Sequence, residues 1–193
     1  MCGINHFIIA LQVRALQMHY SYRNECLDKY GSEFGNQLWE LTNRIFDCLP
    51  LCAVIDGAVY AAHGGIPRAS ISLKDVAALP AEISNPQEEC DIAWEILWSD
   101  PMAQPQFVKM AHYMRVDIDQ CGGYLANKKR GTAWAFNEEA LSRYSLSPQL
   151  HCPKLITHYF RFLAENQLTH VVRAHEVPPV GFWFHFGQKC ATV

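Results

Sequence analysis

The sequence predicts one α/β domain, on three observations. Residues 51–55 and 58–62 are short apolar runs separated only by Asp56-Gly57, a pair favoured in tight turns because both residues accept a positive φ, so a β-hairpin is predicted. Both runs are apolar throughout rather than alternating, which is typical of strands in a sheet covered on both faces. Segments with helical spacing of apolar residues precede and follow this hairpin.

Length and composition fit a single globular domain. The chain has 193 residues, of which 50% are hydrophobic and 18% are charged, enough for a sizeable core. The formal net charge is −3 and basic runs are short, so no nucleic-acid partner is expected. Residues 4–13 are apolar but too few to span a bilayer, and no basic residue precedes them, so no membrane anchor or signal peptide is predicted. We therefore expect an intracellular protein, cytoplasmic or nuclear, whose eight cysteines are buried thiols or metal ligands rather than disulfides.

Two helices are predicted before the hairpin, whereas residues 1–13 carry no clear signal. Residues 14–30 place apolar side chains at roughly helical spacing, and Gly31 provides a stop. Residues 36–48 form a better helix, because an apolar stripe runs along it and the polar side chains lie off that stripe. Pro50 ends this helix. The stripe consists of Leu38, Leu41, Ile45 and Leu49.

Short helices and strands alternate in the middle of the chain. Ser72 is a candidate N-cap for a helix through residue 79. Residues 102–129 are either an inserted helical excursion around residues 107–114 or a mobile loop. Asn137 is a helix start with two acids in the first turn. The remaining predicted elements are a polar connection at 80–89, a helical or 3₁₀ turn at 92–98, a strand at 132–136 and a helix at 153–166.

The last third of the chain repeats the arrangement around His63. Residues 168–173 are a strand candidate that leads to His175, as the second hairpin strand leads to His63, and residues 182–186 and 190–193 are predicted to form a closing hairpin. Strand ends are where α/β sheets bind ligands. Two neutral imidazoles at such ends suit a borderline divalent metal, although a usable site needs at least three protein ligands and an open position for water.

Each candidate also has a structural interpretation. His63 can merely cap its strand, and Gly64-Gly65 can merely turn the chain rather than let a phosphate or metal-bound group approach the backbone. Arg130 can be a surface charge, or it can grip a phosphate through two parallel hydrogen bonds. His170 and His185 are interpreted as hydrogen-bonded strand residues. The sequence has no Gly-x-Ser-x-Gly elbow, P-loop or dinucleotide fingerprint, which disfavours serine-hydrolase and nucleotide-binding functions.

The chain carries five short motifs in order: Tyr20-Ser21-Tyr22-Arg23-Asn24-Glu25-Cys26, His63-Gly64-Gly65, Leu97-Trp98-Ser99-Asp100-Pro101, Arg130-Gly131 and Arg173-Ala174-His175. In order and spacing they resemble the phosphoprotein phosphatase family of metal-dependent serine/threonine phosphatases. The resemblance covers residues 14–193 and corresponds to the C-terminal part of that family's catalytic domain. It implies that residues 1–193 form a single partial domain with a four-layer α/β fold, in which helices flank a central β-sandwich that carries a two-metal site at its strand ends.

The resemblance also implies roles for individual residues. His63 and His175 correspond to the two histidine ligands of the second metal. Arg130 corresponds to an arginine that holds the substrate phosphate, and Asp100 to a supporting acid near the metal-bound water. The implied cofactors are two divalent ions (Mn, Fe or Zn) that activate a bridging water for attack on phosphorus. The implied partners are a phosphoprotein substrate and regulatory proteins.

The sequence lacks the family's N-terminal motifs. Gly-Asp-x-His-Gly, Gly-Asp-x-Val-Asp-Arg-Gly and Gly-Asn-His-Glu supply the first metal's ligands, the bridging aspartate, the catalytic acid and a second phosphate arginine, and none of them is present. Asn5-His6 is a poor substitute, because no glycine directly precedes it and no glutamate follows it. We therefore expect an N-terminally truncated phosphatase domain that is impaired or inactive as a hydrolase, with at most a weak partial metal site. The alternatives are a non-catalytic phosphatase-like binding module and an incomplete gene product.

Overall fold

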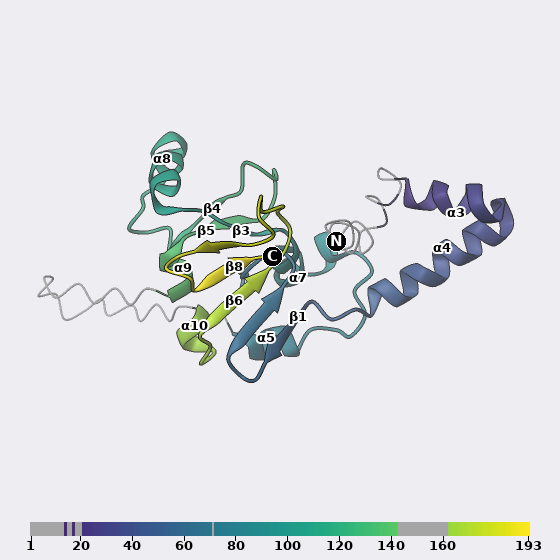
Figure 1. Cartoon of the computed structure of the whole chain (residues 1–193), viewed down its shortest axis with the longest axis horizontal. Coiled ribbons are helices and arrows are strands. Elements are labelled where there is room, and N and C mark those ends of the chain that lie inside the picture. Colours follow the sequence, from purple (N-terminus) through teal and green to yellow (C-terminus); the bar gives the residue numbers. More distant parts are fainter. Residues whose placement is uncertain (1–13, 15–16, 18–20, 71, 143–161) are drawn as a thin grey trace, which may run out of the picture.

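The computed structural model describes residues 14, 17, 21–70, 72–142 and 162–193 (Figure 1). The unassigned first segment, residues 15, 16 and 18–20 of the first predicted helix and residues 153–161 of the last one lie outside the described residues. Among the described residues, no helix is long and apolar enough to cross a membrane.

Two β-sheets form the centre of the fold. Five strands make the larger sheet, in the order β1-β2-β6-β8-β7, and three make the smaller sheet, in the order β3-β5-β4. The strands are β1 (Cys52–Ile55), β2 (Val59–Ala62), β3 (Asp100–Pro101), β4 (Tyr124–Ala126), β5 (Trp134–Phe136), β6 (His170–Arg173), β7 (Trp183–His185) and β8 (Cys190–Thr192).

Both predicted hairpins are present, and β6 lies between them. β1 and β2 pair antiparallel around Asp56 and Gly57, which both have the positive φ that such a turn requires. β7 and β8 pair antiparallel at the other side of the sheet. β6 runs parallel to both β2 and β8. Ala62 at the end of β2 is in register with Arg173 at the end of β6, so the residues that follow these two strands emerge at the same edge.

The helices confirm several local signals. Ser72 Oγ accepts a hydrogen bond from the Lys74 backbone N–H at 3.2 Å, and Asn137 Oδ1 accepts one from the Glu139 N–H at 2.9 Å, so both residues are N-caps. Residues 102–129 contain the inserted helix, together with the unpredicted strand β4. The helices are α3 (Tyr22–Tyr30), α4 (Ser32–Asp47), α5 (Leu73–Ala77), α6 (Pro86–Glu89), α7 (Asp91–Trp98), α8 (Gln104–Met114), α9 (Glu138–Ser142) and α10 (Phe162–Glu165).

The main core joins the two sheets and two of the helices. Tyr60 of β2, Val171 of β6 and Phe136 of β5 belong to one buried cluster, to which α9 contributes Leu141 and α10 contributes Phe162. The predicted α/β architecture is therefore confirmed. Under α8 lies a smaller cluster of Phe107, Ala111 and Leu125.

Helix α4 buries a face other than its apolar stripe. Leu41 and Ile45 of the apolar stripe are each 56% exposed, whereas the polar residues Asn43 and Asp47 are buried. In Figure 1, α3 and α4 extend as a pair away from the two sheets. The helix predicted from this stripe is present, but in the described part of the chain the stripe is not the buried face of α4.

Close packing and polar partners explain which face of α4 is buried. Gly35 faces α3, where an added Cβ would lie 2.5 Å from the Cys26 carbonyl oxygen, so α4 approaches α3 on this face. On the same side of α4, Gln17 Nε2 donates to Asn43 Oδ1 at 2.6 Å, and the Arg14 guanidinium pairs with Asp47 Oδ2 at 2.9 Å. A buried polar face is tolerated when its groups are hydrogen-bonded.

The prediction that both hairpin strands are covered on both faces is wrong for β1. Val54 is 45% exposed and Ile55 is 51% exposed, whereas Tyr60 on β2 is fully buried. Among the strands that the structure describes, β1 is the outermost of its sheet, with β2 as its one neighbour. Within the described ranges every cysteine is a free thiol; Cys26 and Cys190 are buried and Cys48 is exposed.

Candidate functional site

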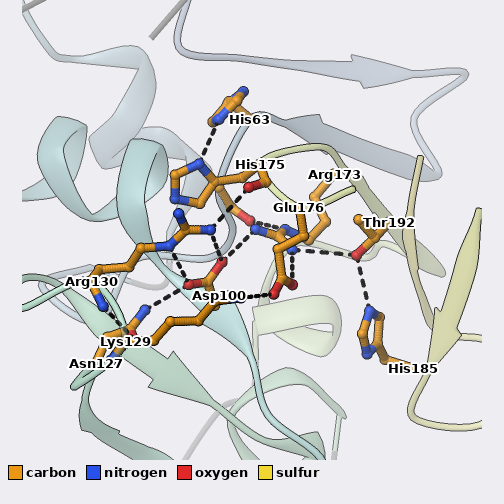
Figure 2. A network of polar contacts seen from close by, with 11 residues as sticks. His63, Asp100, Asn127, Lys129, Arg130, Arg173, His175, Glu176, His185 and Thr192 are labelled. Atoms are coloured by element: carbon orange, nitrogen blue, oxygen red, sulfur yellow. Dashed lines mark hydrogen bonds and ion pairs between the residues drawn. The ribbon is translucent and has the colours of Figure 1, made fainter. Parts of the chain in front are cut away.

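Two loops at one edge of the larger sheet bring His63 and His175 into contact. The Ala174 N–H donates to the His63 carbonyl oxygen at 2.9 Å, which continues the parallel pairing of β2 and β6 beyond the strands. His63 Nε2 lies 2.8 Å from His175 Nδ1, and the ring centroids are 4.7 Å apart (Figure 2). The two histidines that the sequence places at separate strand ends therefore form one site.

His175 is held neutral in a buried position. Burial, the strongest influence, together with the positive charges of Arg130 and Arg173 and the nearby His63, lowers its pKa to about 2, against the opposing effect of Asp100. Its backbone φ of 63° lies in the left-handed region, which residues with a side chain rarely adopt. Its Nε2 atom is buried and has no hydrogen-bond partner among the described residues. Neutral imidazole is the form of histidine that binds metals.

The glycines after His63 make room for protein rather than for a ligand. The N–H groups of Gly64 and Gly65 both donate to the Ile96 carbonyl oxygen at 3.0 Å. An added Cβ on Gly64 would lie 2.5 Å from the Leu97 carbonyl carbon, and one on Gly65 would lie 2.5 Å from Cε1 of Phe136. The glycines therefore allow the C-terminal end of α7 and the core ring to approach, which corrects the ligand-approach interpretation of this pair.

Arg130 is fixed beside the histidines by Asp100. Its Nε donates to Asp100 Oδ2 at 2.9 Å and its Nη2 to Asp100 Oδ1 at 3.3 Å, while Nη2 also donates to the His175 carbonyl oxygen at 2.9 Å. Asn127 Nδ2 donates to Asp100 Oδ2 at 2.8 Å. Burial is the strongest influence and would raise the pKa of Asp100, but the hydrogen bond from Arg130, the charge of Arg173 and the hydrogen bond from Asn127 together lower it to about 2. Asp100 is therefore charged at neutral pH and orients Arg130.

A second arginine, Arg173, lies entirely inside the protein. Its Nη2 donates to Asp100 Oδ1 at 2.7 Å, its Nη1 to Glu176 Oε2 at 2.7 Å and to Thr192 Oγ1 at 3.3 Å, and its Nε to the Gly64 carbonyl oxygen. Figure 2 shows this guanidinium between the two carboxylates. Sequence reasoning gave Arg173 no role. The sequence signal that could have identified it is its position at the end of an apolar strand. An arginine that is buried there needs a charged partner, because arginine is almost never fully buried unless it is paired.

The remaining strand histidines have threonine partners. His170 Nδ1 is 2.8 Å from Thr169 Oγ1 on the exposed side of β6, and His185 Nε2 is 2.9 Å from Thr192 Oγ1. Both agree with their interpretation as hydrogen-bonded strand residues.

The donor set fits two imidazole ligands of a divalent ion and not a complete two-metal centre. Two ring nitrogens face one another, and His175 is neutral as a ligand must be. Asp100, a carboxylate of the same network, is engaged by two arginines and an asparagine. Across residues 21–70, 72–142 and 162–193, no group of three or more His, Cys, Asp or Glu side chains is placed to hold a metal.

Comparison with known proteins gives consistent findings. Residues 5–179 match the family of calcineurin-like phosphoesterases. The chain is 26% identical over 180 residues to a catalytic subunit of protein phosphatase 2A from Dictyostelium discoideum, an alignment that covers 93% of this chain and 45% of the relative. It superposes with a TM-score of 0.65 and 22% identity on a protein serine/threonine phosphatase from Saccharomyces cerevisiae with similarity to human phosphatase PP5, covering 94% of this chain and 44% of that one. The chain thus spans less than half the length of these two proteins.

Proposed function

This chain belongs to the calcineurin-like phosphoesterase family, and we propose that it is a serine/threonine protein phosphatase-like domain whose site lies at the edge formed by His63, His175 and Arg130. The motif resemblance and the metallophosphatase-like fold expected from it are both confirmed by the comparisons. Membership implies divalent metal ions as cofactors and phosphoproteins as substrates.

The contact between His63 and His175 is the observation that supports this proposal most strongly. The two rings come from different strands, lie 2.8 Å apart and share the edge with a guanidinium that is hydrogen-bonded to the His175 carbonyl oxygen. A strand cap alone does not require a second imidazole or a cation at the same place. A ligand pair next to a phosphate-binding arginine requires both.

Each residue has a distinct role in the proposed site. His63 and His175 would hold a Mn, Fe or Zn ion, which would supply Lewis-acid activation of water and phosphate when bound. Arg130 binds the phosphate group through the N–H groups that face away from Asp100. Asp100 acts on the substrate only through Arg130, which it holds in one orientation.

We propose that these 193 residues alone are impaired as a hydrolase. The sequence lacks the three motifs that supply the first metal's ligands, the bridging aspartate and the catalytic acid. Two imidazoles are fewer than the three protein ligands that catalytic metal sites use. The expected behaviour is weak metal binding with little or no phosphate release.

A second candidate function is a non-catalytic binding module. The apolar stripe of α4 supports it, because Leu41 and Ile45 are each 56% exposed and Phe34, one turn before the stripe, is 58% exposed. In this case a protein partner binds independently of the two histidines.

The test combines metal binding with phosphate release. The full chain, His63→Ala, His175→Ala and a control, His170→Ala, are titrated with Mn²⁺ and assayed on a phosphoserine peptide. The control removes an exposed histidine from β6 that bonds to Thr169 and is not part of the site. We expect weak Mn²⁺ binding in the full chain and in His170→Ala, lost in the other two variants. Release of phosphate well above a blank would contradict the impairment, and Mn²⁺ binding that survives both site substitutions would contradict the site.

A further inference from the structure

The site residues close a ring of contacts, and Arg173 is its most buried member. From His63 the ring passes to His175 through the imidazole contact of 2.8 Å. It continues from the His175 carbonyl oxygen to Arg130 at 2.9 Å and from Arg130 to Asp100 at 2.9 Å. Asp100 then pairs with Arg173 at 2.7 Å.

Arg173 completes the ring by returning to the starting loop. Its Nε donates to the carbonyl oxygen of Gly64, the residue covalently linked to His63. A single guanidinium therefore connects the His63 loop with the carboxylate that orients Arg130. The two N–H groups used lie in one rigid plane, so the angle between the two connections is fixed.

Charge and burial make it energetically unfavourable for the Arg173 side chain to leave its partners. The Arg173 side chain is 0% exposed and forms ion pairs with Asp100 and with Glu176. Removing one partner of a buried ion pair leaves an uncompensated charge, which is strongly destabilising. The ring is therefore held in one geometry, and a shift of Asp100 or of the His63 loop requires Arg173 to move.

We propose that Arg173 is the positioning residue of this site, setting the placement of His63 against His175 and, through Asp100, that of Arg130. The expected effect on metal binding rests on the proposed function. The placement of the two imidazole rings does not, because it can be measured without a metal. Arg173 contacts neither substrate nor metal in this role and acts only through Gly64 and Asp100.

The test compares Arg173→Lys with Thr192→Val in the full chain. Lysine keeps the positive charge but lacks the planar fork that reaches Gly64 and Asp100 together. Thr192→Val is a matched control, because it removes a contact of Arg173 at 3.3 Å that is not part of the ring and keeps the side-chain shape. The readout is the ¹⁵N NMR spectrum of the imidazole nitrogens of His63 and His175, followed by titration with Co²⁺.

We expect Arg173→Lys to shift the ring-nitrogen resonances of both histidines and to weaken Co²⁺ binding about 10- to 100-fold, the usual effect of disturbing a residue behind metal ligands. Thr192→Val is expected to keep both resonances and the affinity. A folded Arg173→Lys protein with wild-type resonances for both histidines would overturn the proposal.

A second variant keeps the test decisive if Arg173→Lys does not fold. Asp100→Asn keeps the side-chain shape but weakens the attachment of both arginines to the ring, so the same two resonances are expected to shift. Unchanged resonances would again overturn the positioning role. Failure of the wild-type chain to bind Co²⁺ would refute the proposed metal site, and the ring resonances would then decide the positioning role alone.

Discussion

At Asp100, burial and ion pairing act in opposite directions on one carboxyl group. Burial disfavours the charged form, but Arg130, Arg173 and Asn127 stabilise it, so the folded protein lowers the pKa from 3.8 to about 2. The carboxylate was predicted as a supporting acid near a metal-bound water. The structure places it where it orients Arg130 and pairs with Arg173, and its role toward water stays a prediction.

This pKa shift predicts a specific acid sensitivity. Because the folded pKa lies below the unfolded value, Asp100 stabilises the fold fully above about pH 4, and this contribution is lost as the pH falls toward 2. The loss amounts to roughly 2 kcal/mol. Urea unfolding of wild type and Asp100→Asn between pH 5 and pH 2 checks it, since the variant lacks this titration. A stability difference between the two proteins that does not shrink over this range would contradict the assignment.

The close packing around Gly64 predicts that a side chain added there destabilises the fold. Alanine there would place a Cβ 2.5 Å from the Leu97 carbonyl carbon, which belongs to backbone and cannot rotate away. We expect Gly64→Ala to lower the free energy of unfolding by about 3 kcal/mol. Gly131→Ala is the comparison: its φ is +72° but the space around it is open, so only backbone strain of about 1 kcal/mol is expected. Equal losses in thermal or urea unfolding would show that α7 does not approach Gly64 this closely.

Among the elements, α4 shows where sequence periodicity is insufficient. An amphipathic pattern shows that one face differs from the other, but burial depends on what lies beside the helix. Here Gly35 permits close approach of α3, and the buried Asn43 is satisfied by Gln17, a contact that spans 26 residues of sequence. The caps at Ser72 and Asn137 were predictable because their partners lie two or three residues away.

The buried polar face of α4 predicts an unusual pair of substitutions. Leu41→Gln is expected to change the free energy of unfolding by no more than about 0.5 kcal/mol, because the side chain is 56% exposed. Asn43→Ala is expected to cost about 1 to 3 kcal/mol, because it leaves the buried Gln17 amide without this partner. Chemical denaturation of the 193-residue chain measures both. A larger loss from Leu41→Gln than from Asn43→Ala would restore the stripe as the packed face.

For the whole molecule, the strand ends could be predicted from the sequence, whereas the structure was needed to show which strand ends lie side by side. The turn pair at Asp56-Gly57 and the polar residues after apolar runs are local signals, so the hairpin and the two histidine positions could be predicted. The ring of contacts could not, since Arg173 meets Asp100 across 73 residues and Gly64 across 109 residues. Parallel pairing of β2 with β6 creates these contacts, and no local pattern shows which strands will be neighbours.

The most direct test of the proposed site is the position of a bound metal. Crystals of the full chain grown with Co²⁺ are measured for anomalous scattering at the cobalt edge, with His175→Ala crystals as control. We predict one peak bonded to His63 Nε2 and His175 Nδ1 that disappears in the variant. Cobalt bound elsewhere on the chain, or no peak between the two rings at saturating Co²⁺, would contradict this prediction.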